Sequence, residues 1–170
     1  MREDAHEREN IVALEAAAGG AKEKLRLWLR ALTFTNLVEG RVRARLRDEY
    51  GVTLPRFDMM AALHDAPDGL SMGEVSRRLM VSNGNVTGIA ERLEREGLIV
   101  RRPMPGDRRS QIVRLTEAGR AAFEEMAVEH EAWIAGMLSG LSEGEVETLH
   151  HLLGKAKRSV LGADEGEESA

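Results

Sequence analysis

The sequence predicts a mainly helical chain with one β-hairpin, and two observations carry this prediction. Most of the 170 residues fall into segments whose apolar side chains recur at three- and four-residue spacing, as they do along one face of an α-helix. Between residues 98 and 115 this spacing gives way to two short strand-like runs, the second of them alternating, separated by a Pro-Met-Pro-Gly-Asp turn, which is typical of two paired strands.

The first part of the chain is expected to hold an arm and two helices. Residues 1–20 are polar and then rich in Ala and Gly, which indicates a flexible or partly helical arm. Residues 21–50 form one long helical pattern, and Gly51 ends it because glycine adopts the left-handed conformation that often follows a helix. A second helix begins at Leu54-Pro55, since proline is favoured in the first helical turn, and ends near Leu63.

A short helix, a tight turn and a second helix follow. Ser71 and Glu74 have the spacing of a capping box and begin a helix that ends near Leu79. After the turn at residues 80–82, another helix runs from about residue 83 to residue 96 and ends at Gly97. Such a pair followed at once by an arginine-bearing hairpin predicts a winged helix-turn-helix, whose second helix enters a major groove of DNA while the hairpin reaches the backbone or a minor groove.

Two helices are expected after the hairpin. Thr116 caps a long helix that runs to about Leu138. Ser142 and Glu145 form a second capping box, which begins a last helix ending near Leu161.

The distribution of charge decides how the acidic composition is interpreted. A formal net charge of −5 argues weakly against nucleic acid as a partner. Residues 72–115, however, carry nine arginines against five acidic side chains, so this segment is +4 and the remainder is −9. Arginine is the side chain best shaped for paired contacts to phosphate and guanine, so local charge favours a DNA-binding segment.

Several classes of protein are excluded by composition. The chain has no cysteine, which excludes disulfides, thiolate metal sites and thiol nucleophiles. It has no apolar run near the roughly 18 residues of a membrane span, and its charged first residues lack the apolar stretch of a signal peptide. We therefore expect a soluble cytoplasmic protein.

The hairpin and its surroundings resemble the MarR family of transcriptional regulators. Residues 107–116, Asp-Arg-Arg-Ser-Gln-Ile-Val-Arg-Leu-Thr, look like the wing of that family, with an Asp-x-Arg turn, an alternating strand and a Leu-Thr pair before a helix. The resemblance extends over residues 21–160. Residues 81–88, Val-Ser-Asn-Gly-Asn-Val-Thr-Gly, also look like those of members that respond to aromatic acids or their coenzyme A thioesters.

The resemblance implies a homodimer whose first and last helices interlock, with a ligand cleft between dimerisation and DNA-binding parts. It assigns residues 21–53 and 116–162 to dimerisation helices and residues 54–115 to the DNA-binding domain. Residues 163–170 are expected to form a disordered acidic tail. Two departures stand out: Met80 occupies a turn where the family usually has a small residue or glycine, and the reading helix has Gly84 and Gly88 but no basic residue in its first turns.

The reading helix supplies the first group of candidate DNA contacts. Asn83, Asn85 and Thr87 are expected to face the major groove, where asparagine can form a paired hydrogen bond with adenine. Helix capping is their alternative role, although Ser82 is the expected cap and is itself a candidate contact. Arg92 can either reach a phosphate or pair with Glu96 one turn later.

The wing supplies the second group. Arg109 matches the arginine of the Asp-x-Arg turn and is expected to enter the minor groove or hold a phosphate. Arg108 is a second candidate. Asp107 is expected to orient a neighbouring arginine, because a carboxylate is repelled by DNA. The alternative for both arginines is a solvated turn.

Aromatic residues make up only 4% of the chain, so the few large ones are candidates for core packing or for a ligand cleft. In a cleft, arginines near one end would hold a carboxylate or phosphate. The candidates are Trp28, Phe34, Phe57, His64 and Trp133 for the apolar part, and Arg30, Arg41 and Arg43 for the charged end.

No catalytic, metal-binding or cofactor-binding constellation is expected. The adjacent His150 and His151 would point about 100° apart on a helix. The expected function is a DNA-binding transcriptional regulator, a homodimeric repressor released from a pseudo-palindromic operator by an aromatic acid or an aryl-coenzyme A thioester. The alternative is a winged-helix protein-interaction module that does not bind DNA.

Overall fold

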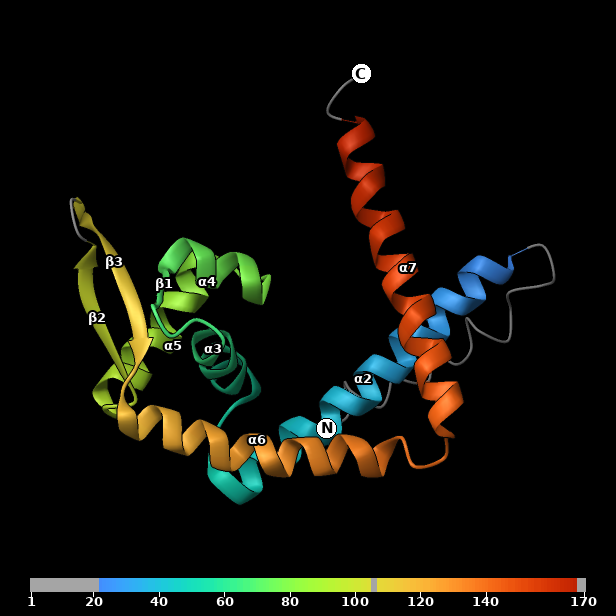
Figure 1. Ribbon diagram of the computed structural model, residues 1–170, viewed down its shortest axis with the longest axis horizontal. Coiled ribbons are helices and arrows are strands. Elements are labelled where there is room, and N and C mark those ends of the chain that lie inside the picture. Colours follow the sequence, from blue (N-terminus) through green and yellow to red (C-terminus); the bar gives the residue numbers. More distant parts are fainter. Residues whose placement is uncertain (1–21, 105–106, 168–170) are drawn as a thin grey trace, which may run out of the picture. The chain divides into compact units, whose positions relative to one another are not determined.

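The computed structural model describes residues 22–104 and 107–167, with backbone alone at residues 83, 104, 107–110 and 163–167 (Figure 1). The expected arm at residues 1–20 lies outside the described residues. The elements in chain order are α2 (Glu23–Tyr50), α3 (Leu54–His64), β1 (Leu70–Ser71), α4 (Met72–Leu79), α5 (Asn83–Arg95), β2 (Ile99–Met104), β3 (Asp107–Leu115), α6 (Glu117–Met137) and α7 (Glu143–Glu167). The chain divides into two compact units, residues 1–131 and 132–170.

The helix ends lie where local sequence chemistry places them. Gly51 follows α2 in the left-handed conformation, with φ of 64°. Ser71 and Glu74 form the expected capping box at α4: the backbone N–H of Ser71 donates to Glu74 Oε2 at 2.7 Å, and the N–H of Glu74 donates to Ser71 Oγ at 3.3 Å. Thr116 Oγ1 accepts the N–H of Gly119 at 3.0 Å at the start of α6. These three predicted helix boundaries are confirmed.

The sheet has one strand more than the predicted hairpin. It is three-stranded and antiparallel in the order β1-β3-β2, with Leu70 opposite Val113 and Ile99 opposite Leu115. Gly69, at φ of 89°, leads into β1, and a Cβ at this position would collide with Ile112 of β3. Glycine therefore allows the chain to come close enough to β3 for β1 to pair with it.

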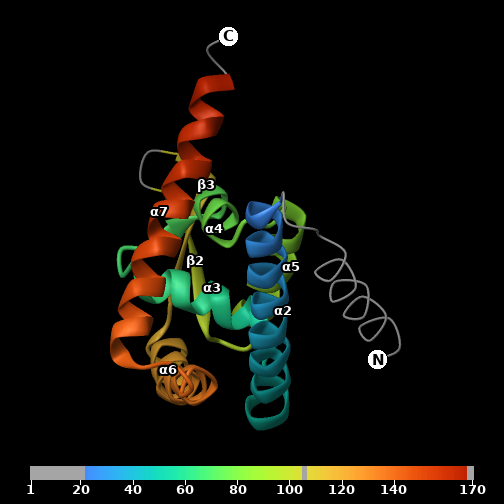
Figure 2. The same ribbon diagram turned by 90° about the vertical axis from the view of Figure 1, so that its right-hand side faces the viewer.

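Helices α3, α4 and α5 pack on one another beside the sheet, as Figures 1 and 2 both show. Their shared core is apolar and almost completely buried, and it includes Met59, Leu63, Val75, Val86 and Leu93. The long strands β2 and β3 extend from this core as a hairpin, the wing (yellow in Figure 1). The predicted winged helix-turn-helix is thus present.

The second unit is dominated by α7, whose apolar side chains are unusually exposed. Leu149, Leu152, Leu153 and Val160 recur on one face of the helix and are 39%, 54%, 52% and 65% exposed. Helix α7 also continues to Glu167, so residues 163–167 are helical, although the acidic composition predicts disorder from residue 163 onward. Among the described residues, no helix is long and apolar enough to cross a membrane.

Candidate functional site

Helix α5 has one face in the protein core and the opposite face free. Val86, Ala90 and Leu93 are completely buried and anchor the helix against α3 and α4. Because helical residues are rotated by about 100° from one to the next, Asn85 and Arg92 lie together on one exposed flank, and Thr87 lies on the other. All three side chains are exposed, as contact with a groove requires.

A strip of glycine separates the two flanks of α5. Gly84 and Gly88 both lie on the exposed face, and a Cβ at either position would meet nothing within 4 Å. Glycine inside a helix is unfavourable by roughly 1 kcal/mol relative to alanine, and no packing among the described residues explains it here. The face instead presents bare backbone between polar flanks, which is the shape needed for close approach by another molecule.

The N-terminus of α5 is exposed beside this strip. Ser82 occupies the N-cap position with extended backbone, but its side chain makes no capping hydrogen bond, so the predicted capping role is confirmed in position only. Exposed amides at a helix N-terminus form a favourable site for a phosphate. Met80, in the turn before it, adopts the left-handed conformation with φ of 53° and is 87% exposed.

The wing brings the second group of candidates onto β3. Asp107, Arg108 and Arg109 form the start of this strand, next to the hairpin turn, with Asp107 opposite Met104. For these three residues and for Asn83 in α5, the structure describes the backbone and not the side chain. Their backbone positions place one polar group at the start of α5 and the others at the tip of the wing.

An ion pair braces the wing against α5. Arg101 Nε on β2 donates to Glu94 Oε2 on α5 at 2.7 Å, and Arg101 Nη2 contacts the same oxygen. The hydrogen bond from Arg101 holds the pKa of the Glu94 carboxyl below its usual value. This link fixes the root of the hairpin relative to the helix, and it joins two residues whose pairing the sequence did not predict.

A second ion pair changes the interpretation of Arg92. The sequence left open a pairing of Arg92 with Glu96, but Arg56 Nη2 on α3 pairs with Glu96. Arg92 is exposed, and its contact with a phosphate stays a prediction. A hydrogen bond also links the segment before α6 to the segment after α5: Thr116 Oγ1 donates to the backbone carbonyl of Gly97 at 2.7 Å.

Two ligand candidates, Phe57 and His64, lie in an aromatic cluster with Phe123 and His130 of α6. The ring centroids of Phe57 and His130, and those of His64 and Phe123, are each 4.9 Å apart, and those of Phe57 and Phe123 are 5.4 Å apart. Burial lowers the pKa of the His130 imidazole, and His64 Nε2 lies 3.4 Å from Glu124 Oε1. Phe123 and His130 were missed, although their spacing of seven residues places them on one face of a helix.

The remaining ligand candidates are distributed over α2 and α6. Trp28 and Phe34 of α2 are 59% and 46% exposed. Arg30, Arg41 and Arg43 are exposed on the same helix, where Arg43 pairs with Glu39 at 3.4 Å. Trp133 is buried in the second unit.

Comparison with known proteins agrees with this architecture. The model of the MarR family matches residues 50–110. PecS, an HTH-type transcriptional regulator of Dickeya dadantii, is 31% identical over 76% of this chain and 80% of its own length. BadR, a transcriptional activatory protein of Rhodopseudomonas palustris, is 33% identical over 84% of this chain and 83% of its own. The crystal structure of a MarR family transcriptional regulator from Silicibacter pomeroyi is 34% identical, with a TM-score of 0.70, and the match covers 84% of this chain and 99% of that one.

Proposed function

Because the chain belongs to the MarR family of DNA-binding transcriptional regulators, we propose that it acts as a ligand-responsive repressor that binds a pseudo-palindromic operator as a homodimer. Its family consists of regulators and not of enzymes, and its place of action would be the cytoplasm. The observation that carries the proposal is the exposed face of α5, where a glycine strip lies between polar flanks on a helix whose opposite face is fully buried.

In this proposal α5 reads a major groove. Ser82, Asn83 and Asn85 near its N-terminus, with Thr87, contact base edges or phosphates, and Arg92 contacts a phosphate further along. Gly84 and Gly88 let the helix backbone come close to the groove. Arg108 and Arg109 hold the adjacent backbone or minor groove, and Asp107 orients one of them.

A dimer gives the exposed apolar faces a partner. The stripe on α7 and the exposed Trp28, Phe34 and Leu37 of α2 would be costly in an isolated chain and favourable between two chains. Residues 21–53 and 116–162 would then be dimerisation helices around the DNA-binding domain at 54–115. Twofold symmetry places two α5 helices in half-sites about one helical turn, roughly 34 Å, apart.

The ligand-responsive part of the proposal rests on the aromatic cluster of Phe57, His64, Phe123 and His130. Its tilted aromatic rings suit the flat body of an aromatic acid or aryl-coenzyme A thioester. The proposed further contacts are Arg30, Arg41, Arg43, Trp28, Phe34 and Trp133. The cluster joins α3 to α6, so a ligand there would favour a dimer whose reading helices have the wrong separation.

The DNA-binding proposal is tested by mobility-shift titration on the DNA upstream of its own gene. Arg109→Ala is expected to weaken binding by at least about tenfold, since it removes a charged contact to DNA. Lys155→Ala, on α7, removes an equal charge outside the proposed DNA contacts and is expected to leave binding unchanged. If Arg109→Ala binds as tightly as the wild type, the wing assignment is wrong.

The ligand response is tested separately, by thermal shift with 4-hydroxybenzoate and with benzoyl-coenzyme A. A compound that raises Tm and also releases DNA identifies the effector class, and Phe57→Leu should reduce both effects. If only the free acid raises Tm, the thioester is dropped; if neither does, the proposed effector classes are wrong. Repression predicts higher reporter expression when the gene is deleted; lower expression would instead indicate an activator, as the name of BadR describes that relative.

A further inference from the structure

The turn between α4 and α5 holds Met80 in a conformation that methionine rarely adopts. Its φ of 53° is the one positive value at a non-glycine residue in the described part of the chain. The N–H of Met80 donates to the carbonyl of Arg77, and the N–H of Val81 donates to that of Ser76, both at 3.3 Å. These two bonds form a Schellman motif, whose left-handed position is usually taken by glycine. Ser76 Oγ also donates to the carbonyl of Val81 at 2.6 Å, so the turn fixes the backbone from which the Met80 side chain projects.

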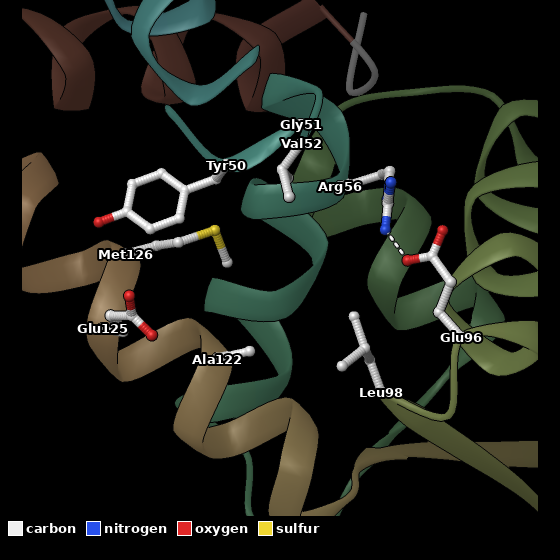
Figure 3. Close-up of a pocket in the computed structure, with 9 residues that line it drawn as sticks. All are labelled: Tyr50, Gly51, Val52, Arg56, Glu96, Leu98, Ala122, Glu125 and Met126. Atoms are coloured by element: carbon white, nitrogen blue, oxygen red, sulfur yellow. Dashed lines mark hydrogen bonds and ion pairs between the residues drawn. The ribbon is translucent and has the colours of Figure 1, made fainter. Parts of the chain in front are cut away.

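Met80 is also the most exposed methionine whose side chain the structure describes. It is 87% exposed, whereas the others are buried or half-buried: Met59, Met60, Met72, Met126 and Met137. Met126, for example, is 3% exposed and lines a cavity together with Tyr50 and Val52 (Figure 3). Because an oxidant has to reach a thioether sulfur to react with it, Met80 is the methionine of this set that is open to oxidation.

The stability of the fold gives no reason for methionine in this turn. A residue with a Cβ is strained in the left-handed conformation, and an apolar side chain that stays exposed gains nothing from burial. Glycine would complete the same two backbone hydrogen bonds without the strain. A role for this side chain therefore has to come from what it meets outside the fold.

Met80 lies beside the end of α5 that the proposed function places against DNA. Ser82, two residues later, is the N-cap of α5, and its side chain makes no capping hydrogen bond. The amides at such a helix end attract a phosphate. A phosphate bound there brings the DNA backbone close to the Met80 side chain.

The thioether of methionine reacts with hydrogen peroxide in one two-electron step. A lone pair of the sulfur attacks one peroxide oxygen, so that an S–O bond forms while the O–O bond breaks. The proton on the transferred oxygen moves to the released hydroxide, which leaves methionine sulfoxide and one water. The sulfur is oxidised and the peroxide is reduced, and methionine sulfoxide reductases reverse the change. The chain has no cysteine that would compete for the oxidant.

We propose that Met80 is an oxidation site, through which hydrogen peroxide weakens DNA binding. The proposal rests on the proposed function, in which the N-terminus of α5 approaches DNA. Oxidation converts an apolar side chain into a polar one whose oxygen carries partial negative charge, so the phosphates of DNA repel it. The fold itself is expected to tolerate the change, because the Met80 side chain is exposed.

Peptide mass spectrometry tests the oxidation itself. The full-length protein is treated with hydrogen peroxide, the peroxide is removed with catalase, and the sulfoxide at each methionine is quantified after digestion. Met80 is expected to be oxidised at least about tenfold faster than the buried Met59 and Met60. The Tm of the oxidised protein should stay close to that of the untreated protein.

Fluorescence anisotropy on the DNA upstream of its own gene tests the effect on binding. The oxidised wild type is expected to bind at least about tenfold more weakly, and treatment with methionine sulfoxide reductases A and B should restore its affinity. Met80→Leu keeps an apolar side chain without sulfur, so it should bind before and after peroxide like the untreated wild type. Met80→Gln introduces a polar group without oxidation and should weaken binding. Met137→Leu, at the end of α6, is the matched control and should lose affinity on oxidation as the wild type does.

Each result supports or overturns one part of the proposal. Oxidation of Met80 no faster than that of the buried methionines would overturn the site. Sulfoxide at Met80 with unchanged affinity would overturn its effect on DNA binding, and a loss of affinity that persists in Met80→Leu would assign the effect to another methionine. If the untreated protein does not bind DNA, the proposed function fails and the effect on binding fails with it. The peptides still show in that case whether Met80 is oxidised first, so the two failures are distinguishable.

Discussion

Replacing Gly88 by alanine should make the protein more stable and its DNA complex weaker. Gly88 lies inside α5, between residues 83 and 95, on the face opposite the buried Val86, Ala90 and Leu93. A Cβ at this position meets nothing within 4 Å, so the free chain gains a better helix former without any collision. In the complex, the same methyl group would stand between the helix backbone and the DNA.

The two effects have opposite signs and comparable sizes. Removing glycine from a helix interior is worth about 0.5–1 kcal/mol, which raises Tm by about 1–4 °C for a chain of this length. Displacing the helix from the groove by the width of a methyl group loosens several contacts at once. We expect an affinity loss of at least about tenfold, or about 1.4 kcal/mol.

Differential scanning calorimetry and fluorescence anisotropy on one operator duplex measure both effects. Gly154→Ala is the matched control, because Gly154 lies inside α7, and its Cβ would approach only the flexible end of Arg158, at 3.6 Å. The control should raise Tm by a similar amount and leave affinity unchanged. If Gly88→Ala gains stability and binds DNA as tightly as the wild type, close approach through the glycine strip is refuted.

Three further substitutions test the framework around the site. Gly119→Ala should lower the free energy of unfolding by about 2 kcal/mol or more in urea denaturation, because its Cβ would collide with the backbone carbonyl of Leu98; a neutral result would contradict the packing of α6 on the root of β2. Burial raises the pKa of the Asp58 carboxyl from 3.8 to about 6. Above about pH 6 the carboxyl is ionised in the folded state, and this buried charge lowers the free energy of unfolding. Asp58→Asn should therefore be more stable than the wild type at pH 8, and this advantage should shrink below pH 6 and vanish below 3.8; an equal advantage at pH 8 and at pH 3.5 would contradict it. Arg101→Glu should lower both stability and DNA affinity by detaching the wing from α5, and Glu94→Arg in the same chain should restore part of each, whereas failure of that rescue would show that the ion pair does not hold the wing.

The parts of the fold that follow from neighbouring residues could be predicted from sequence. The capping box of Ser71 and Glu74 and the glycine end of α2 involve residues at most a few positions apart, so their chemistry is visible in the sequence itself. The winged helix-turn-helix followed from the order of such local elements. The exposed polar flanks of α5 followed from helical spacing once its buried face was assigned.

Features that depend on distant residues could not be predicted in this way. Strand β1 has two residues and exists because it pairs with β3, about 40 positions later. Glu96 has a basic residue one turn before it, yet its partner is Arg56, which tertiary packing brings from α3. The acidic end of the chain has the composition of a disordered segment, whereas α7 continues to Glu167 as a helix.

The most direct test of the central claim is the affinity of the protein for the DNA upstream of its own gene, measured by fluorescence anisotropy over a range of salt concentrations. Binding by the α5 faces and wings of a dimer displaces counterions from phosphates, so log Kd should rise linearly and steeply with log salt concentration. Titration at high protein concentration should saturate at two chains per duplex. Absent binding, or affinity that does not change with salt, would contradict the account.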